Sequence, residues 1–199
     1  PCRWRELPEG PELTTFATGI GRTNGLSLGA DGALIACAHD ARTVLRFDED
    51  GQATPIATHF DGKRLNSPND LVARGNGDIY FTDPPYGLND LDPEARELDF
   101  HGVFLLRPDG SMTVASDRFM RPNGLAFSPD QSVLYVGDSG GPRDVWAFDV
   151  ADDGSLSNNR RFADLDLSDN LRNPDGMKCD ADGRLWTTGP GGICVVEPD

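Results

Sequence analysis

The chain has 199 residues and a formal net charge of −15, which argues against nucleic acid or an anionic membrane surface as a partner. No stretch approaches the roughly 20 apolar residues that a membrane-spanning helix requires, so we expect a soluble protein. Residues 1–20 contain no apolar signal region and the chain begins Pro-Cys, so the compartment is not predicted and the true start is expected to lie upstream.

The composition favours an all-β protein with a single domain. The 23 glycines and 15 prolines predict many turns between short strands. No linker divides the sequence, so we expect one domain over residues 1–199. The cysteines do not form a Cys-x-x-Cys pair, which argues against a zinc ribbon or a thioredoxin-type site.

The first predicted element is a hairpin at the start of the chain. Residues 3–7 and 13–16 are predicted strands, and the turn between them contains Pro8-Glu9-Gly10. We interpret this hairpin as the third and fourth strands of a sheet. Its first two strands are not in the sequence.

Four polar residues then mark the start of four repeated units. Asn24, Asn69, Asn123 and Asp175 recur about every 50 residues, and each precedes a short apolar run. A turn follows seven residues after each of them, at Asp31-Gly32, Asn76-Gly77, Asp130-Gln131 and Asp182-Gly183. Asp-Gly and Asn-Gly favour tight hairpin turns because both residues tolerate positive φ. We expect the four polar residues to converge on one site.

The remaining strands follow in the same order in each unit. Second strands are predicted at residues 33–37, 78–82, 133–136 and 184–187, and third strands at 43–47, 102–106, 145–148 and 193–196. A more polar fourth strand closes the unit, as at residues 111–115. A short helical turn is expected between residues 86 and 100. Four antiparallel strands in a repeated unit are typical of a β-propeller blade.

The two ends of the chain allow two interpretations. Three units are complete, a half unit stands at the front, and three quarters of a unit stand at the back. Either the chain is part of a larger propeller, or strands from both ends combine into one blade that closes a small four-bladed ring.

Several motifs resemble the SMP-30/gluconolactonase/luciferin-regenerating family, in its gluconolactonase-like branch. They are Gly62-Lys63-Arg64-Leu65-Asn66-Ser67-Pro68-Asn69-Asp70-Leu71, Tyr80-Phe81-Thr82-Asp83-Pro84-Pro85-Tyr86-Gly87, Arg121-Pro122-Asn123-Gly124-Leu125 and Pro174-Asp175-Gly176-Met177. The resemblance implies a six-bladed propeller, of which this chain represents about four blades, truncated at both ends. It also implies one divalent cation in the central channel.

The resemblance further implies roles for single residues. Asn123 and Asp175 match two metal ligands, and Asn69 matches the channel asparagine that faces metal and substrate. Asp175 matches the residue proposed as a general base for the attacking water. The family's other ligand is a Glu in a Glu-Gly-Pro-Val-Trp motif, and the context of Glu9 differs from that motif, so we interpret Glu9 as a turn residue.

The residue types suit this chemistry, and each also has a structural alternative. Hard cations bind carboxylate and amide oxygens, so we expect calcium, with magnesium, manganese, zinc and iron as alternatives. Arg64 is predicted to bind substrate, or else to be a solvated surface residue. His39 either lines the pocket or is an ordinary loop histidine. The Asn-Gly and Asp-Gly pairs alternatively make turns only.

These expectations predict a metal-dependent hydrolase that opens a sugar lactone, such as gluconolactone, to the aldonic acid. The bound metal would polarise the lactone carbonyl. The alternatives are hydrolysis of another ester or a phosphotriester, and a non-catalytic propeller that acts as a binding scaffold. The expected partner is a small-molecule lactone, with no nucleic acid and no membrane. The oligomeric state is not predicted.

Overall fold

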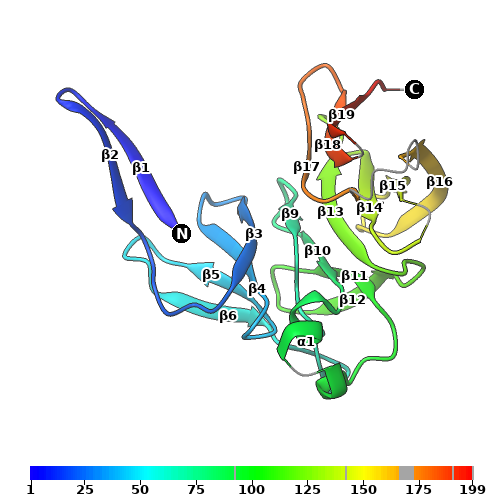
Figure 1. The fold of residues 1–199 in the computed structure, drawn as a ribbon, viewed down its shortest axis with the longest axis horizontal. Helices are drawn as coiled ribbons and strands as arrows, with labels where there is room; N and C mark the ends of the chain where they lie inside the picture. Colours follow the sequence, from blue (N-terminus) through cyan, green and yellow to red (C-terminus); the bar gives the residue numbers. More distant parts are fainter. Residues whose placement is uncertain (92, 142, 166–172, 190, 199) are drawn as a thin grey trace.

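The computed structural model describes residues 1–91, 93–141, 143–165, 173–189 and 191–198, and it is almost entirely β-structure. Four successive antiparallel sheets follow one another around an arc, and a two-stranded hairpin stands before the first of them (Figure 1). The chain therefore forms a four-blade, propeller-like arrangement, as the repeated units predict.

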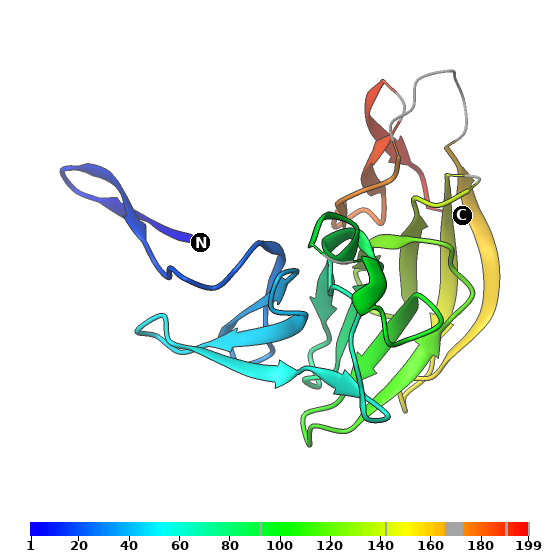
Figure 2. The same ribbon diagram turned by 60° about the horizontal axis from the view of Figure 1, so that its bottom comes forward.

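The N-terminal hairpin consists of β1 (Cys2–Leu7) and β2 (Gly10–Thr15), paired from Cys2 with Thr15 to Leu7 with Gly10. Both views show it projecting away from the four sheets (Figures 1 and 2). Glu9 lies in its turn, as predicted. The predicted alternative of a closed four-bladed ring is wrong for the described residues. The hairpin pairs only with itself and the last sheet contains only its own strands.

The four sheets repeat one strand order, from the inside of the arc outward. The first sheet contains β3 (Thr23–Leu28), β4 (Leu34–Ala38), β5 (Thr43–Phe47) and β6 (Ala53–Ala57). The second contains β9 (Leu71–Ala73), β10 (Ile79–Asp83), β11 (Gly102–Leu106) and β12 (Met112–Ser116). The third contains β13 (Pro122–Phe127), β14 (Val133–Asp138), β15 (Asp144–Val150) and β16 (Leu156–Asp164), and the last contains β17 (Met177–Cys179), β18 (Leu185–Gly189) and β19 (Gly192–Val196).

Two short insertions interrupt this pattern. A ribbon of β7 (His59–Phe60) and β8 (Lys63–Arg64) connects the first and second sheets. The helix α1 (Tyr86–Leu91) and the 3-10 turn η1 (Pro93–Ala95) lie between β10 and β11, where the sequence predicts a helical turn. The predicted second and third strands agree with the observed ones to within a few residues at their ends.

The hairpin turns have the backbone conformation that their sequences predict. Gly32, Gly77 and Gly183 have φ values of 80°, 93° and 87°. Gln131 occupies the same place in the third unit with a φ of 60°. Only Gly adopts this region without steric cost, so the third unit accepts some strain at its turn.

The core lies between successive sheets. Phe81 and Phe104 stack 5.3 Å apart in the cluster shared by the first two sheets. Tyr80 meets Phe127 edge-on at 5.4 Å between the second and third sheets. Leu185 of the last sheet packs in a cluster with residues of the third. Each sheet thus depends on its neighbour to bury its apolar face.

Adjacent inner strands approach very closely, and glycines permit this approach. β3 contacts β9, β9 contacts β13, and β13 contacts β17. A Cβ atom at Gly25 would lie 2.5 Å from the Cα of Asp70, and one at Gly124 would lie 1.9 Å from the carbonyl oxygen of Asp175. Gly25 and Gly124 therefore serve inter-sheet packing, so the interpretation of these two Asn-Gly pairs as turns alone is wrong.

The loop that leads into β9 is held by buried polar contacts. The Arg42 guanidinium, only 5% exposed, donates to the carbonyl oxygens of Leu65 at 2.7 Å and Asn66 at 3.1 Å. Asp83, at the end of β10, accepts a hydrogen bond of 2.7 Å from the Asn66 N–H. The Ser67 hydroxyl donates to the Pro84 carbonyl at 2.6 Å. Because Asn69 follows in this loop, these contacts fix the start of the site.

Burial of Asp83 has an electrostatic cost. Burial raises the pKa of Asp83 from 3.8 to about 7, and the backbone N–H groups of Asn66 and Ser67, followed by the Arg42 charge, only partly oppose this increase. The folded protein therefore holds a proton on Asp83 at pH values where the unfolded chain has lost it.

We predict that Gly124→Ala destabilises the fold by at least about 2 kcal/mol, because the new methyl group overlaps the Asp175 carbonyl. Gly176→Ala is the matched control, since a Cβ there would meet nothing within 4 Å. It should change the free energy of unfolding by no more than about 0.5 kcal/mol. Urea denaturation of both variants measures the difference, and equal midpoints would contradict the close approach.

A second prediction concerns the pH dependence of stability. Because the folded pKa of Asp83 lies above its unfolded value, the free energy of unfolding should fall as the pH rises from about 4 to about 7. A shift of this size corresponds to about 4 kcal/mol. The neutral amide of asparagine resembles the protonated acid. The free energy of unfolding of Asp83→Asn should therefore equal that of the wild type at pH 4 and exceed it at pH 8.

Denaturation midpoints across this pH range test the second prediction. Asp152→Asn is its control, because Asp152 is an exposed acid in the turn after β15. The control should follow the wild-type pH profile. A stability profile of Asp83→Asn that also parallels the wild type would contradict the cost assigned to Asp83.

Candidate functional site

Three of the four repeated polar residues lie in one chain of hydrogen bonds at the inner strands. Asn24 Nδ2 donates to Asn69 Oδ1, and Asn69 Nδ2 donates to Asn123 Oδ1 at 2.6 Å. The chain continues from Asn123 Nδ2 to Ser139 Oγ at 3.1 Å, and from the Ser139 hydroxyl to the Pro174 carbonyl at 2.5 Å. We call these five residues the amide relay. It crosses all four sheets and ends beside Asp175.

The direction of the relay follows from its last member. A backbone carbonyl only accepts, so the single hydroxyl hydrogen of Ser139 is committed to Pro174. Ser139 Oγ must then accept from the NH₂ group of Asn123, which turns Asn123 Oδ1 toward Asn69. Asn69 meets that oxygen with its own NH₂ group, so Asn69 Oδ1 must face donors. The accept-only carbonyl thus assigns the orientation of both amides.

Local backbone irregularities aim these side chains. The strand register shifts between Thr23 and Leu26 in β3, and between Pro122 and Leu125 in β13, so each of these asparagines lies in a β-bulge. A bulge re-aims a side chain relative to a regular strand. Asn69 lies just before β9, where its N–H donates to the Thr82 carbonyl at 2.8 Å. It is 1% exposed, and Asn123 is 9% exposed.

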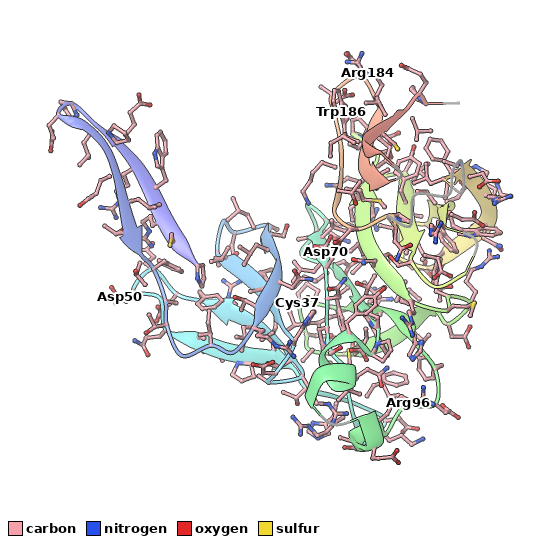
Figure 3. The ribbon with its side chains drawn as sticks, viewed as in Figure 1. Cys37, Asp50, Asp70, Arg96, Arg184 and Trp186 are labelled. Atoms are coloured by element: carbon pink, nitrogen blue, oxygen red, sulfur yellow. The ribbon has the colours of Figure 1, made fainter. Side chains whose placement is uncertain are left out.

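Asp175 lies at the open side of this arrangement. Its backbone N–H donates to Thr188 Oγ1 at 2.8 Å, and its side chain is exposed. It lines a cavity of about 500 Å³ together with Asn24, Asp70 and Lys178. Figure 3 shows Asp70 on the inner side of the arc and Trp186, which also lines the cavity, toward the far end.

Asp70 is a site residue that the sequence analysis did not select. Burial raises the pKa of Asp70, and the nearby Asp175 carboxylate raises it further, whereas the Leu71 N–H and the Lys178 ammonium lower it. The two carboxylates are therefore close enough to repel each other. A signal was present in the sequence, since an acid stands after Asn69 where the other units have glycine.

The donor set fits a hard divalent cation. Asn123 Oδ1 accepts one hydrogen bond and retains a second lone pair, and Asp175 lies just before β17, with its backbone against Gly124. These are the oxygen ligands that calcium and magnesium prefer. Within the described ranges, no group of three or more His, Cys, Asp or Glu side chains is arranged to hold a metal. The predicted ligands thus amount to one amide oxygen and one carboxylate.

His39 and Tyr86 approach the relay from the loops above it. His39 Nε2 lies 3.0 Å from Asn69 Oδ1, so this histidine belongs to the site. Burial raises the pKa of the Tyr86 hydroxyl, which contacts the side chains of Ser139 and Asn123. Tyr86 is the first residue of helix α1, so the start of this helix lies against the relay.

Arg64 makes its described hydrogen bonds with residues outside the relay. Its guanidinium donates to the Ala41 carbonyl at 3.2 Å, and its N–H donates to Glu97 Oε2 at 2.8 Å. No hydrogen bond described for Arg64 joins it to Asn69, Asn123 or Asp175. Substrate binding by Arg64 stays a prediction.

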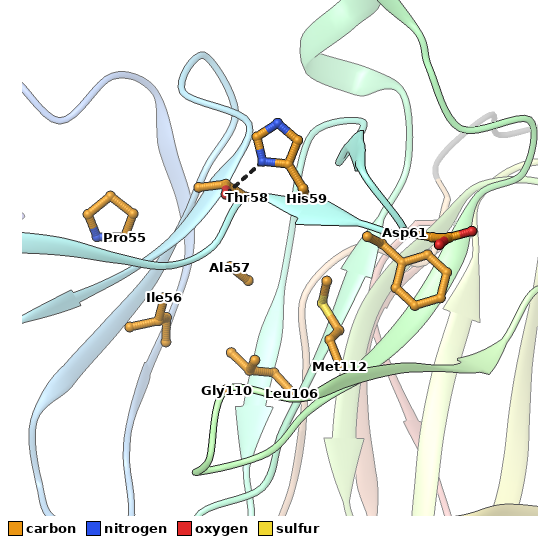
Figure 4. A pocket seen from close by; sticks show the side chains of 10 residues that line it. Pro55, Ile56, Ala57, Thr58, His59, Asp61, Leu106, Gly110 and Met112 are labelled. Atoms are coloured by element: carbon orange, nitrogen blue, oxygen red, sulfur yellow. Dashed lines mark hydrogen bonds between the residues drawn. The ribbon is translucent and has the colours of Figure 1, made fainter.

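A separate cavity of about 610 Å³ lies between β6 and the β11–β12 hairpin (Figure 4). Its polar feature is a 2.9 Å contact between His59 Nδ1 and Thr58 Oγ1, and apolar side chains such as Ile56 and Met112 line most of the rest. None of the predicted site residues lines this cavity, so the candidate site is the inner one.

Solved structures of gluconolactonases resemble this chain closely. A gluconolactonase from Xanthomonas campestris has a TM-score of 0.85 and 39% identity, covering 98% of this chain and 64% of that one. A putative gluconolactonase has a TM-score of 0.83 and 32% identity, with 98% and 66% covered. A luciferin-regenerating enzyme shares the fold at a TM-score of 0.74 and 21% identity, with 98% and 64% covered.

Sequence relatives agree with the structural ones. The gluconolactonase of Zymomonas mobilis is 37% identical over 184 residues, covering 89% of this chain and 52% of that protein. A pentonolactonase of Haloferax volcanii is 27% identical over 179 residues, covering 88% and 55%. The chain thus spans about half the length of these curated relatives. Among the described residues, no helix has both the length and the apolar character to cross a membrane.

A family model described as the SMP-30/Gluconolactonase/LRE-like region matches residues 7–199. This match covers almost the whole chain and includes every residue of the amide relay. The chain belongs to the SMP-30/gluconolactonase/LRE-like family.

Proposed function

We propose that residues 1–199 act as one propeller domain of a metal-dependent lactonase, which opens a sugar lactone to the aldonic acid. The observation that carries this proposal is the amide relay ending beside an exposed carboxylate. Asn123 belongs to this relay, and Asp175 directly follows its last member, Pro174, and lines the inner cavity. The gluconolactonase relatives, at 37% and 39% identity, support the substrate class.

The cavity suits a neutral, hydroxyl-rich ligand. Its lining combines the amide of Asn24 and the hydroxyls of Thr187 and Thr188 with the apolar faces of Trp186 and Ile193. Polar groups of this kind bind sugar hydroxyls, and an aromatic face packs on the C–H groups of the ring. A lactone of a sugar acid offers both surfaces. The product is an anion, which the acidic lining of Asp70 and Asp175 would repel.

One divalent cation, calcium in the first instance, would be held by Asn123 Oδ1 and the Asp175 carboxylate. Magnesium, manganese, zinc and iron remain alternatives because they also accept oxygen ligands. A cation bound there supplies Lewis acidity, which polarises the lactone carbonyl and stabilises the oxyanion of the tetrahedral intermediate.

The residues of the chain perform the remaining tasks. The Asp175 carboxylate has two oxygens, so one is available to accept a proton from the water that attacks the carbonyl carbon. Asn69 uses one hydrogen of its NH₂ group on Asn123, and the other can donate to a lactone oxygen. Tyr86 lies against Ser139 and Asn123 and limits the access of bulk water to them. We propose that Arg64 binds the substrate, and this assignment rests only on the resemblance to the family.

We predict that this protein releases protons when glucono-δ-lactone and calcium are added, and that Asp175→Ala lowers the initial rate about 100- to 10,000-fold. The loss follows from removal of both a ligand and a proton acceptor. A pH-stat measures the rate after subtraction of spontaneous lactone opening. Asp152→Asn, an exposed acid outside the cavity, should keep the wild-type rate. Equal rates for wild type and Asp175→Ala would defeat the role of Asp175.

A separate prediction concerns metal binding. Calcium or manganese at about 100 times its Kd should raise the free energy of unfolding by about 2.7 kcal/mol, because only the folded state holds both ligands. Asn123→Ala and Asp175→Ala should each abolish the increase in the thermal midpoint. Differential scanning calorimetry with and without EDTA measures it. No shift at millimolar metal would contradict the metal site, whatever the lactone assay shows.

A further inference from the structure

The first observation concerns how His39 is held. Its N–H donates to the Arg22 carbonyl at 2.9 Å, and its own carbonyl accepts from the Arg42 N–H at 3.1 Å. A Cβ atom at Gly87 would lie 3.0 Å from the Cβ of His39, so helix α1 packs directly against this residue. His39 therefore lies on a fixed loop of the first sheet, while its ring reaches the second sheet.

The second observation concerns what the ring meets. His39 Nε2 lies 3.0 Å from Asn69 Oδ1, and the amide relay has already assigned that atom as the oxygen. An amide oxygen cannot donate, so Nε2 carries the hydrogen. Both the neutral Nε2–H tautomer and the protonated ring satisfy this requirement. At this position His39 supplies a hydrogen bond and does not act as a base.

The third observation concerns the alternative state of Asn69. Asn24 also donates to Asn69 Oδ1, but Asn24 is exposed at the edge of the cavity, whereas Asn69 is 1% exposed. With both donors present, both lone pairs of this buried oxygen are used. Asn69 then presents its NH₂ group to Asn123. Without His39, one lone pair of this buried oxygen loses its donor, and the Asn69 amide is held less firmly in its orientation.

We propose that His39 is a positioning residue for the metal site. Its Nε2–H fixes the oxygen of Asn69 toward the first sheet, and Asn69 in turn fixes Asn123 Oδ1 in the direction from which it binds a divalent cation. This inference rests on the proposed function for the identity of the cation site. It assigns to a histidine outside the ligand set a contribution to cation affinity that passes through two amides.

The main test compares two substitutions of His39. Leu has a similar size but no donor, and Gln carries an amide N–H at a similar reach. His39→Leu should weaken calcium binding about 10- to 100-fold, as loss of a group that orients a metal ligand typically does. His39→Gln should restore most of the affinity. Isothermal titration calorimetry with calcium chloride gives both values. Equal calcium affinity in His39→Leu and wild type, or equal losses in both variants, would overturn the proposal.

The second test asks whether the effect passes through Asn69. In an Asn69→Ala background, His39→Leu should cause no further loss of calcium affinity, because the intermediate amide is absent. An additional loss as large as in the wild-type background would overturn the proposal. Glucono-δ-lactone hydrolysis by the same variants gives a parallel comparison of kcat and KM.

The third test needs neither metal nor substrate. If the wild-type chain binds no divalent cation, the proposed function fails, and the relay is tested by a double-mutant cycle on unfolding in EDTA. His39 and Asn123 share no described hydrogen bond, so additive effects of His39→Leu and Asn123→Ala would overturn the positioning role. Non-additive effects support transmission through Asn69. If His39→Leu does not fold, His39→Ala replaces it, with His39→Gln as the rescue.

Discussion

The site depends on one acceptor that cannot reverse its role. Because the Pro174 carbonyl only accepts, the hydroxyl of Ser139 and the amides of Asn123 and Asn69 each have one allowed orientation. The relay draws its members from all four sheets and from the loops next to them. The orientation of the amides is therefore correct only when all four sheets stand in their proper order, and the fold specifies the chemistry through hydrogen-bond direction rather than through charge.

Close contact between sheets makes this relay short enough to work. The bulges in β3 and β13 turn the side chains of Asn24 and Asn123 inward, and the glycine after each of these two residues lets the next inner strand approach. Gly25 and Gly124 do so directly, whereas the glycine in the last unit, Gly176, meets no neighbour. One dipeptide thus provides both the donor group and the distance over which it acts. Turns are made elsewhere, by the Asp-Gly and Asn-Gly pairs seven residues later.

Much of the fold was predictable because its signals are local. Turn dipeptides, apolar runs and their repetition predict the strands and their grouping, and these depend on neighbouring residues only. The convergence of Asn24, Asn69 and Asn123 was also predictable, since equivalent positions of a radial repeat lie at one axis. The partners of His39 and Ser139 were not predictable, because irregular loops bring them to the relay. The placement of Arg64 beside Ala41 has the same origin. Sequence spacing carries no information on loop paths of this kind.

The amide relay contains no group that ionises near neutral pH. Its amides, hydroxyl and carbonyl stay neutral, and the His39 ring can donate through Nε2 in either protonation state. The hydrogen bonds within the relay therefore do not depend on the protonation state of any of its five members. Asp70, Asp175 and Lys178 are the acidic and basic side chains that line the cavity, so salt screens the interactions of a charged ligand there. The protein thus sets the geometry of the site with uncharged groups and places its charged groups at the wall of the cavity, where the solvent affects them.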